Sequence, residues 1–153
     1  MKIIKVEVKH PIDFTKSPNK WYQFFRRWYI ANTDGEIIIY TDVGVFHVTW
    51  KKGFGLDGRS GGIFVDPIFP NWGTDEEKIP VIVHDICFFF FVLSFQMSNE
   101  MLRSLMEFYG TAQWRCNAVY FGVSTPIAYN EFGCKNAKEM TNKSLCNMTW
   151  DVK

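Results

Sequence analysis

The segment EIIIYTDVGVFHVTW, residues 36–50, decides the first half of the fold. Its β-branched part, Glu36–Thr41, favours a strand. Val45–Trp50 has the period of two that strands have, which places Val45, His47 and Thr49 on one face. Asp42-Val43-Gly44 between the two parts has the composition of a turn. The segment therefore predicts two antiparallel strands joined by a short connection.

The residues before this segment also favour strands. Trp21–Ala31 is rich in aromatic side chains. Asn32-Thr33-Asp34-Gly35 reads as a turn, because an Asp-Gly pair supplies the positive φ that tight hairpins require. Met1–Glu7 alternates charged and apolar side chains as a strand does, and we expect no signal peptide there because it lacks an apolar stretch. A meander of three or four antiparallel strands is expected within residues 1–52.

Residues 53–80 are dominated by glycine and proline. Five glycines fall within residues 53–62, and Pro67, Pro70, Gly73 and Pro80 follow. This density of residues that break helices and strands predicts a long irregular loop. Loops of this length in a compact domain usually carry function or wrap the core.

Beyond the loop the pattern changes to that of helices. Val81–Phe95 is apolar on nearly all sides and follows Pro80, a residue favoured near the first turn of a helix. Its run of phenylalanines would also suit a strand, so its length and the resemblance described below decide for a helix. A second helix is expected at Asn99–Tyr109, with Ser98 as its N-cap.

The rest of the chain completes the expected fold. Gly110 ends the second helix, and a third is expected at Thr111–Phe121. The polar residues 124–153 predict an irregular tail. The chain of 153 residues has the length of one domain. The expected fold class is α+β, with the N-terminal meander packed against two or three C-terminal helices in residues 81–123.

The composition narrows the classes of function. Hydrophobic residues make up 47% and charged residues 22%, which is typical of a globular chain rather than a disordered one. A net charge of +1 offers no basic surplus for contacts with nucleic-acid phosphates. Aromatic residues, at 18%, are more abundant than a core of this size needs, so we expect some of them at an interface.

One stretch raises the question of a membrane span. Ile79–Met97 is dominated by apolar residues, but it contains Pro80 and the pair His84-Asp85. A charged side chain inside a bilayer is costly, so a buried core helix explains the stretch better and no span is expected.

The four cysteines fit no metal or redox motif. Cys87, Cys116, Cys134 and Cys146 include no C-x-x-C pair, which argues against a zinc ribbon or a thioredoxin-type site. Cys87 lies in an apolar run and is most simply a small buried hydrophobic residue. Cys134 and Cys146 flank a polar segment and would either pair in an oxidising compartment or remain free thiols.

The pair His84-Asp85 is the main candidate for chemistry. Adjacent helical residues point about 100° apart, so the two side chains are better placed for separate tasks than for bonding each other. The histidine would act as a general base if a carboxylate oriented its second ring nitrogen. The aspartate would bind a hard cation if carbonyls or a second carboxylate joined it. The alternative is that both are buried polar groups satisfied by loop backbone, which would fix the glycine-rich loop to the helix.

The glycine-rich segment 53–62 is the second candidate. It is not a P-loop, because no Gly-Lys-Ser/Thr follows. Its backbone would still be able to present carbonyls to a cation or N–H groups to an anion. Asp57 and Ser60 supply its reactive side chains, although Asp57 would equally well cap its own loop.

These motifs resemble, in this order, a family of small phage and bacterial proteins known as domain of unknown function 1353. In that family a strand meander runs into a Gly-Phe-x-x-Asp-x-x-Ser loop, and a hydrophobic helix bearing His-Asp follows. Here the loop is Gly53-Phe54-Gly55-Leu56-Asp57-Gly58-Arg59-Ser60 and the helix contains Val83-His84-Asp85-Ile86. The resemblance covers residues 36–109. Gly61-Gly62 stand where the family has an apolar residue and a proline. Phe88 stands where the family has an aromatic residue, often tyrosine, and it lacks the hydroxyl.

The family pattern is in turn similar to the His-Asp helix of phospholipase A2. That likeness implies His84 as the base that activates water, Asp85 as a calcium ligand, and the loop with Gly53 and Gly55 as a source of carbonyl ligands. Asn99 would stand in for the aspartate that orients the histidine. A neutral amide holds a tautomer but stabilises an imidazolium far less than a carboxylate does. The paired cysteines of the secreted enzymes are also missing.

The function expected first is therefore contact with other proteins. The resemblance, the aromatic excess and the long irregular segments favour a small phage-encoded component of the virion, in the tail, neck or head, which binds other virion proteins or itself and needs no cofactor. Its expected place is the virion or the host cytoplasm. The alternative is a calcium-assisted hydrolase that uses His84 and Asp85 on a lipid or cell-envelope substrate, and a third possibility is an inhibitor of a host protein. The hydrolase requires an open cleft at His84 and a carboxylate within about 3 Å of its ring.

Overall fold

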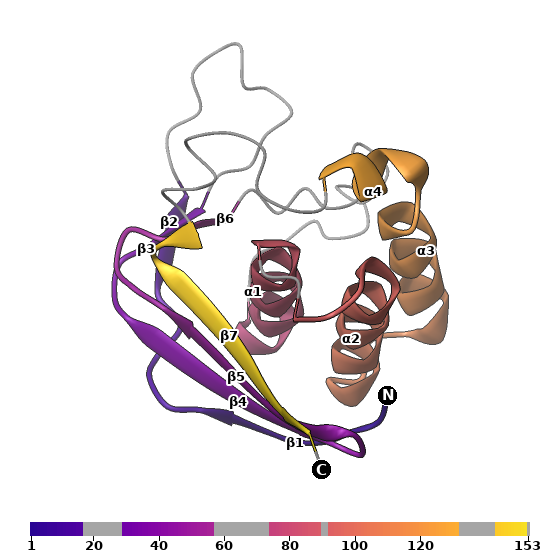
Figure 1. The fold of residues 1–153 in the computed structure, drawn as a ribbon, viewed down its shortest axis with the longest axis horizontal. Coiled ribbons are helices and arrows are strands. Elements are labelled where there is room, and N and C mark those ends of the chain that lie inside the picture. Colours follow the sequence, from indigo (N-terminus) through magenta and orange to yellow (C-terminus); the bar gives the residue numbers. More distant parts are fainter. Residues whose placement is uncertain (17–28, 57–73, 90–91, 132–142, 153) are drawn as a thin grey trace.

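We describe a computed structural model of the chain, over residues 1–16, 29–56, 74–89, 92–131 and 143–152. The expected α+β class is confirmed: a curved antiparallel sheet stands on one side, and the helices stand on the other (Figure 1). The elements are, in chain order, β1 (Ile3–Val8), β2 (Phe14–Lys16), β3 (Tyr29–Ala31), β4 (Gly35–Thr41), β5 (Gly44–Trp50), β6 (Gly55–Leu56), α1 (Asp75–Phe89), α2 (Phe95–Phe108), α3 (Gln113–Val123), α4 (Pro126–Glu131) and β7 (Cys146–Val152).

The main sheet has the strand order β1-β4-β5-β7, and all its neighbours are antiparallel. The hairpin predicted from residues 36–50 is its centre, with Tyr40 opposite Val45 at the turn and Gly35 opposite Trp50 at the open end. The turn is fixed by Thr41, whose hydroxyl donates a hydrogen bond of 2.8 Å to the carbonyl of Gly44.

The expected turn at residues 32–35 does not join neighbouring strands, and this part of the meander was predicted wrongly. The β3 strand pairs with β2 and β6 in a second, three-stranded sheet, so the turn leads from one sheet to the other. Gly35 has no positive φ. Glycine is needed there for another reason, because an added Cβ would lie 2.0 Å from the ring of Trp50. The part of the expected strand before Tyr29 lies outside the described residues.

The C-terminal residues 146–152 are not irregular, contrary to the sequence prediction. They form β7, which pairs along its whole length with β5. Their alternation was the missed signal: Cys146 and Met148 are buried on the core face, whereas Asn147, Thr149 and Asp151 are exposed. The α4 helix is a second regular element in the expected tail, whose residues 132–142 lie outside the described part of the chain.

The helix boundaries also correct the prediction. The α1 helix begins at Asp75, inside the expected loop, so that Pro80 lies within it rather than near its first turn. Thr74 and Glu77 form a reciprocal capping box, in which each side chain accepts the other's backbone N–H. The expected helix over residues 81–95 is divided, because Phe95 already belongs to α2. The third helix is confirmed to within two residues as α3.

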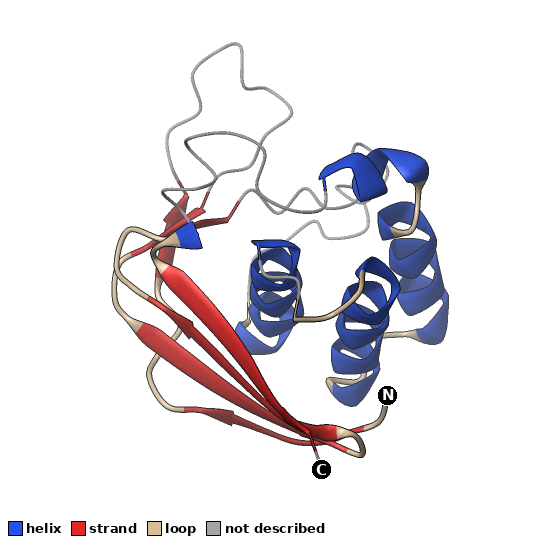
Figure 2. Ribbon diagram, in the orientation of Figure 1, coloured by secondary structure: helices blue, strands red, loops and turns tan. Residues whose placement is uncertain are grey.

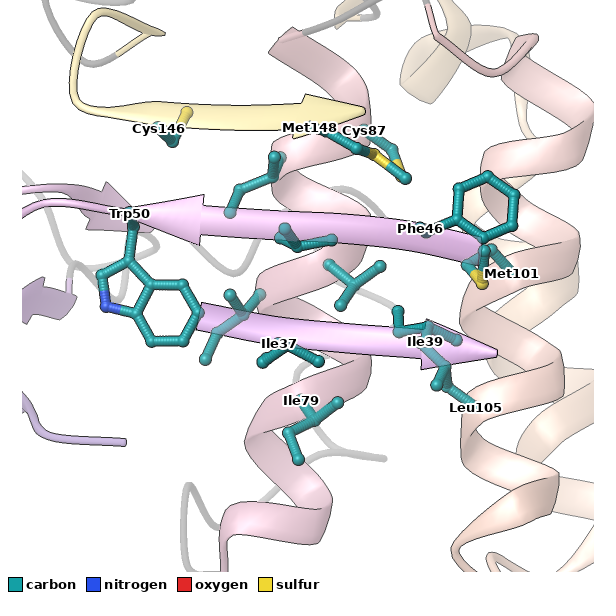
Figure 3. Packing of buried hydrophobic residues seen from close by; sticks show 14 of the residues in the cluster. Ile37, Ile39, Phe46, Trp50, Ile79, Cys87, Met101, Leu105, Cys146 and Met148 are labelled. Carbon is teal, nitrogen blue, oxygen red and sulfur yellow. The ribbon is translucent and has the colours of Figure 1, made fainter. Parts of the chain in front are cut away.

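The core lies between the main sheet and the first two helices (Figure 3). From the sheet, Ile37, Ile39, Phe46 and Met148 point towards the helices. The helices contribute Ile79, Ile82, Val83, Ile86 and Cys87 of α1 and Met101 and Leu105 of α2 to the same core. The expectation of a buried core helix around His84 is therefore confirmed. Among the described residues, no helix is long and apolar enough to cross a membrane.

The α3 helix lies on the side of α2 that faces away from the sheet (Figure 2). A separate apolar cluster holds the two helices together, and it consists of Leu102, Met106, Cys116, Val119 and Val123. The domain thus has three layers, with α3 as the outermost.

Candidate functional site

The three predicted site residues of the helices are buried together. His84 and Asp85 lie on α1, with 2% and 6% of their surfaces exposed, and Asn99 lies on α2 with 1% exposed. The neighbours of the pair on α1, Ile82, Val83 and Ile86, are completely buried. An interior this apolar makes each polar group dependent on its hydrogen-bond partners.

The ring of His84 is bound to the side chain of Asn99. The distance from Nε2 of His84 to Oδ1 of Asn99 is 2.8 Å. The amide nitrogen of Asn99 donates to the carbonyl of Val123 at 3.2 Å and to the hydroxyl of Ser124 at 3.4 Å. Because this nitrogen faces two acceptors, the amide oxygen is the atom that faces His84, and Nε2 must be the ring nitrogen that carries hydrogen.

Asp85 does not form a short bond to its neighbour. Its Oδ1 lies 3.9 Å from Nδ1 of His84, which is longer than a hydrogen bond. This agrees with the expectation that adjacent helical residues diverge. The partner at hydrogen-bond distance from the imidazole is thus an amide, and the carboxylate is a more distant neighbour.

A row of aromatic rings begins at the histidine. The ring of Phe88 lies 4.5 Å from that of His84, and Phe95 lies 5.8 Å from Phe88. Tyr129 of α4 meets Phe95 edge to face at 5.1 Å. Only 2% of the surface of His84 is exposed. Within the described part of the structure, the open cleft that a hydrolase needs at this ring is therefore not formed.

The predicted loop residues divide into two groups. Gly53 has a φ of 90°, and its N–H donates to the carbonyl of Ala31 at 2.8 Å, while Gly55 belongs to β6 and pairs with Ile30. Both therefore help to build the small sheet. Asp57 and Ser60 lie outside the described residues. Within the part of the chain that is described, no group of three or more His, Cys, Asp and Glu side chains could hold a metal ion. The assignment of Asp85 as a metal ligand stays a prediction.

The cysteines of the described residues are buried. Burial raises the pKa of the Cys87 thiol to about 12, and its Sγ lies 3.4 Å from Sδ of Met148. The expectation of a small buried hydrophobic residue is therefore confirmed. Cys146 is also buried, and its Sγ lies 3.7 Å from the carbonyl oxygen of Lys143. Cys134 lies outside the described residues, so the pairing of these two cysteines stays a prediction.

A second candidate site was not located from the sequence. The outward face of α3 carries Trp114 and Phe121, which are 67% and 79% exposed. The two are seven residues apart, about two helical turns, and therefore share a face. The aromatic excess predicted an interface, and the spacing of these two residues would have indicated a candidate place for it.

The chain has no match among known proteins in these comparisons. No family model matches it, and no curated protein or solved structure matches it either.

Proposed function

We propose that this chain acts by protein–protein contact, with the outward face of α3 as its docking surface. The observation that carries the proposal is the exposure of Trp114 and Phe121 on one helical face. Tryptophan and other large aromatic side chains supply much of the binding energy at protein interfaces.

The α3 helix is apolar on two opposite sides. Its inner side, with Cys116, Val119 and Val123, is buried against α2. Its outer side exposes two large rings that together offer on the order of 300 Å² of apolar surface. A helix that is apolar all round is normally buried, and apolar patches of about this size on monomers are often functional. A partner that covered this face would remove both rings from water.

The buried polar residues support the same proposal. His84 binds Asn99, and Asn99 binds the carbonyl of Val123, the last residue of α3. This chain of hydrogen bonds joins α1, α2 and the end of α3. A docking helix benefits from such a fixed orientation, because a rigid surface loses less entropy when it binds.

The partner class that we propose is the other proteins of a phage virion, in the tail, neck or head. The resemblance to a phage and bacterial family supports this part, and the fold alone does not specify it. Mass spectrometry of particles purified from the phage that encodes the chain tests it directly. A chain that is absent from the particles would contradict the virion proposal.

A matched pair of variants tests the α3 surface. Trp114→Ser with Phe121→Ser removes both rings, and Gln113→Ser with Asn117→Ser changes two exposed polar residues of the same helix. We expect the first pair to reduce incorporation into particles at least tenfold and the second to leave it unchanged. Equal incorporation of both would show that the partner binds elsewhere.

The calcium-assisted hydrolase is the second proposal, because one observation favours it: Asn99 contacts His84 at 2.8 Å, in the position that the likeness to phospholipase A2 implies for the orienting residue. The closed position of His84 weighs against it. Calorimetric titration with calcium, repeated on Asp85→Ala with folding checked by circular dichroism, tests it. Saturable binding that is lost in a folded variant would favour the hydrolase and lead to assays on phospholipid. No binding in the native chain would end the proposal.

A further inference from the structure

The two edges of the main sheet differ in a way that concerns association. The β1 edge has an irregular register between Ile3 and Lys5, and its charged side chains Lys5, Glu7 and Lys9 form ion pairs along the strand. Bulges and lysines are the usual protection of an edge against pairing with another chain. The β7 edge keeps an unbroken register from Cys146 to Val152, and Asp151 is its one charged residue.

The hydrogen-bonding direction of β7 follows from one contact. The N–H of Lys51 donates to the carbonyl of Leu145 at 2.7 Å, so these two form a hydrogen-bonded pair. Because such pairs alternate in an antiparallel ladder, Asn147, Thr149 and Asp151 direct their backbone groups towards β5. The backbone groups of Met148 and Trp150 then point away from β5. Among the described strands, none lies on that side of β7.

We propose that β7 pairs with β7 of a second copy of this chain, antiparallel and with the two-fold axis at Thr149. In this register Met148 exchanges backbone hydrogen bonds with Trp150 of the partner subunit, and Trp150 does so with the partner subunit's Met148. The outward groups of the strand are thereby satisfied in both copies, and the two main sheets become one continuous sheet. Addition of a strand to an exposed edge is a common mode of recognition.

The side chains are complementary in the same register. On the outer face, the amide of Asn147 lies opposite the carboxylate of Asp151 of the partner subunit, so the negative charge meets a donor and no like charges oppose each other. Thr149 lies opposite its own symmetry mate, a favourable cross-strand pair. On the core face, Met148 lies opposite Trp150 of the partner subunit, so two apolar positions face each other. Centring the register on Thr149 is also what lets the whole of β7 overlap with its mate.

This dimer is independent of the α3 surface. The two surfaces lie on different elements, and α3 is separated from the sheet by α2 (Figure 1). An experiment that contradicts one proposal therefore does not contradict the other. The tests below are chosen to distinguish the two.

Cysteine cross-linking tests the register. In the proposed dimer the two Thr149 residues form a non-hydrogen-bonded pair with Cα atoms about 4.5 Å apart. That distance permits a disulfide. We expect Thr149→Cys to give a covalent dimer under mild oxidation, and Asn147→Cys or Asp151→Cys alone to give at least tenfold less. The double variant Asn147→Cys with Asp151→Cys should cross-link again. All three positions are exposed, so the variants should fold.

Sedimentation equilibrium tests the association without a covalent bond. Asn147→Lys places a cation opposite Asp151 of the partner subunit, and Asn147→Asp places a like charge there, so we expect the dimer dissociation constant to differ roughly tenfold between them, with the lysine variant tighter. The variant without the rings of Trp114 and Phe121 should still dimerise. A native chain that stays monomeric, with Thr149→Cys cross-linking no better than the single controls, would overturn the proposal. A dimer that is lost with the α3 rings would assign the association to α3 instead.

Discussion

Nε2 of His84 lies 2.8 Å from Oδ1 of Asn99, across an apolar interface between α1 and α2 and over a separation of fifteen residues. Asn99 in turn donates to the carbonyl of Val123, so the contact continues to the end of α3. A buried polar chain stabilises a fold when every member is satisfied and destabilises it when one is removed. In this state His84 and Asn99 belong to a buried chain of hydrogen bonds that joins α1, α2 and the end of α3.

The first prediction concerns Asn99→Ala. The change leaves the ring N–H of His84 and the carbonyl of Val123 without their partner inside the protein, so we expect the free energy of unfolding to fall by about 2–4 kcal/mol. Urea denaturation measures it. Asn117→Ala on the exposed face of α3 is the matched control and should change stability by less than about 0.5 kcal/mol. Equal small effects would mean that the buried chain contributes nothing to folding.

The second prediction concerns Gly35→Ala. The new Cβ would lie 2.0 and 2.2 Å from atoms of the Trp50 ring, which is fully enclosed by the core. We expect a loss of about 1–3 kcal/mol, because the ring has to shift against neighbours such as Phe14. Thermal unfolding followed by circular dichroism measures it. Adding Trp50→Leu should make Gly35→Ala less costly than it is in the native background, and strictly additive effects of the two changes would contradict the clash.

The two halves of the fold were not equally predictable from the sequence. The hairpin of β4 and β5 follows from a local pattern, because its two strands are consecutive in the sequence. The neighbours of this hairpin in the sheet are distant segments: β1 pairs with β4, and β7 pairs with β5 from the far end of the chain. For such long-range pairing, the local sequence of a strand does not indicate which other strand it pairs with. The alternation of Cys146–Val152 indicates a strand. The polar composition of residues 124–153 led to the prediction of an irregular tail instead.

The site shows the same division. The types of His84 and Asp85 marked them as candidates, and the resemblance alone implied that Asn99 lies against His84, as it does in the structure. Phe88 packs against His84, and the contacts continue through Phe95 to Tyr129, so the three rings come from three helices. No spacing rule indicates that these rings converge. The Trp114 and Phe121 face, by contrast, follows from helical periodicity alone once the helix is recognised.

The third prediction concerns alkaline pH. Burial raises the pKa of the folded Cys87 thiol from 9.0 to about 12, whereas the unfolded thiol keeps its ordinary value. The stabilising contribution of this thiol is therefore complete below pH 9.0 and is lost as the pH rises towards about 12. We expect the free energy of unfolding to fall less steeply with pH over this range in Cys87→Ala than in the native chain. Urea denaturation at several pH values measures both slopes, and parallel slopes would contradict the shift.

The last prediction separates the true N-cap of α2 from the one that its sequence suggested. Ser94 has extended backbone with φ −63° and ψ 160°, and its hydroxyl accepts the N–H of Met97 at 3.2 Å. Ser98, the expected cap, is completely buried inside the helix, and its hydroxyl donates to the carbonyl of Ser94 at 3.0 Å.

Aspartate at each position distinguishes the two serines. Ser94→Ala should cost about 1 kcal/mol, and Ser94→Asp should restore that stability, because a carboxylate also caps the helix and interacts favourably with its N-terminal dipole. Ser98→Asp should instead destabilise the fold by more than about 3 kcal/mol, since it places a carboxylate where no solvent reaches. Chemical denaturation of the three variants measures these differences. If Ser98→Asp were tolerated and Ser94→Asp were not, α2 would begin at Asn99 as its sequence first indicated.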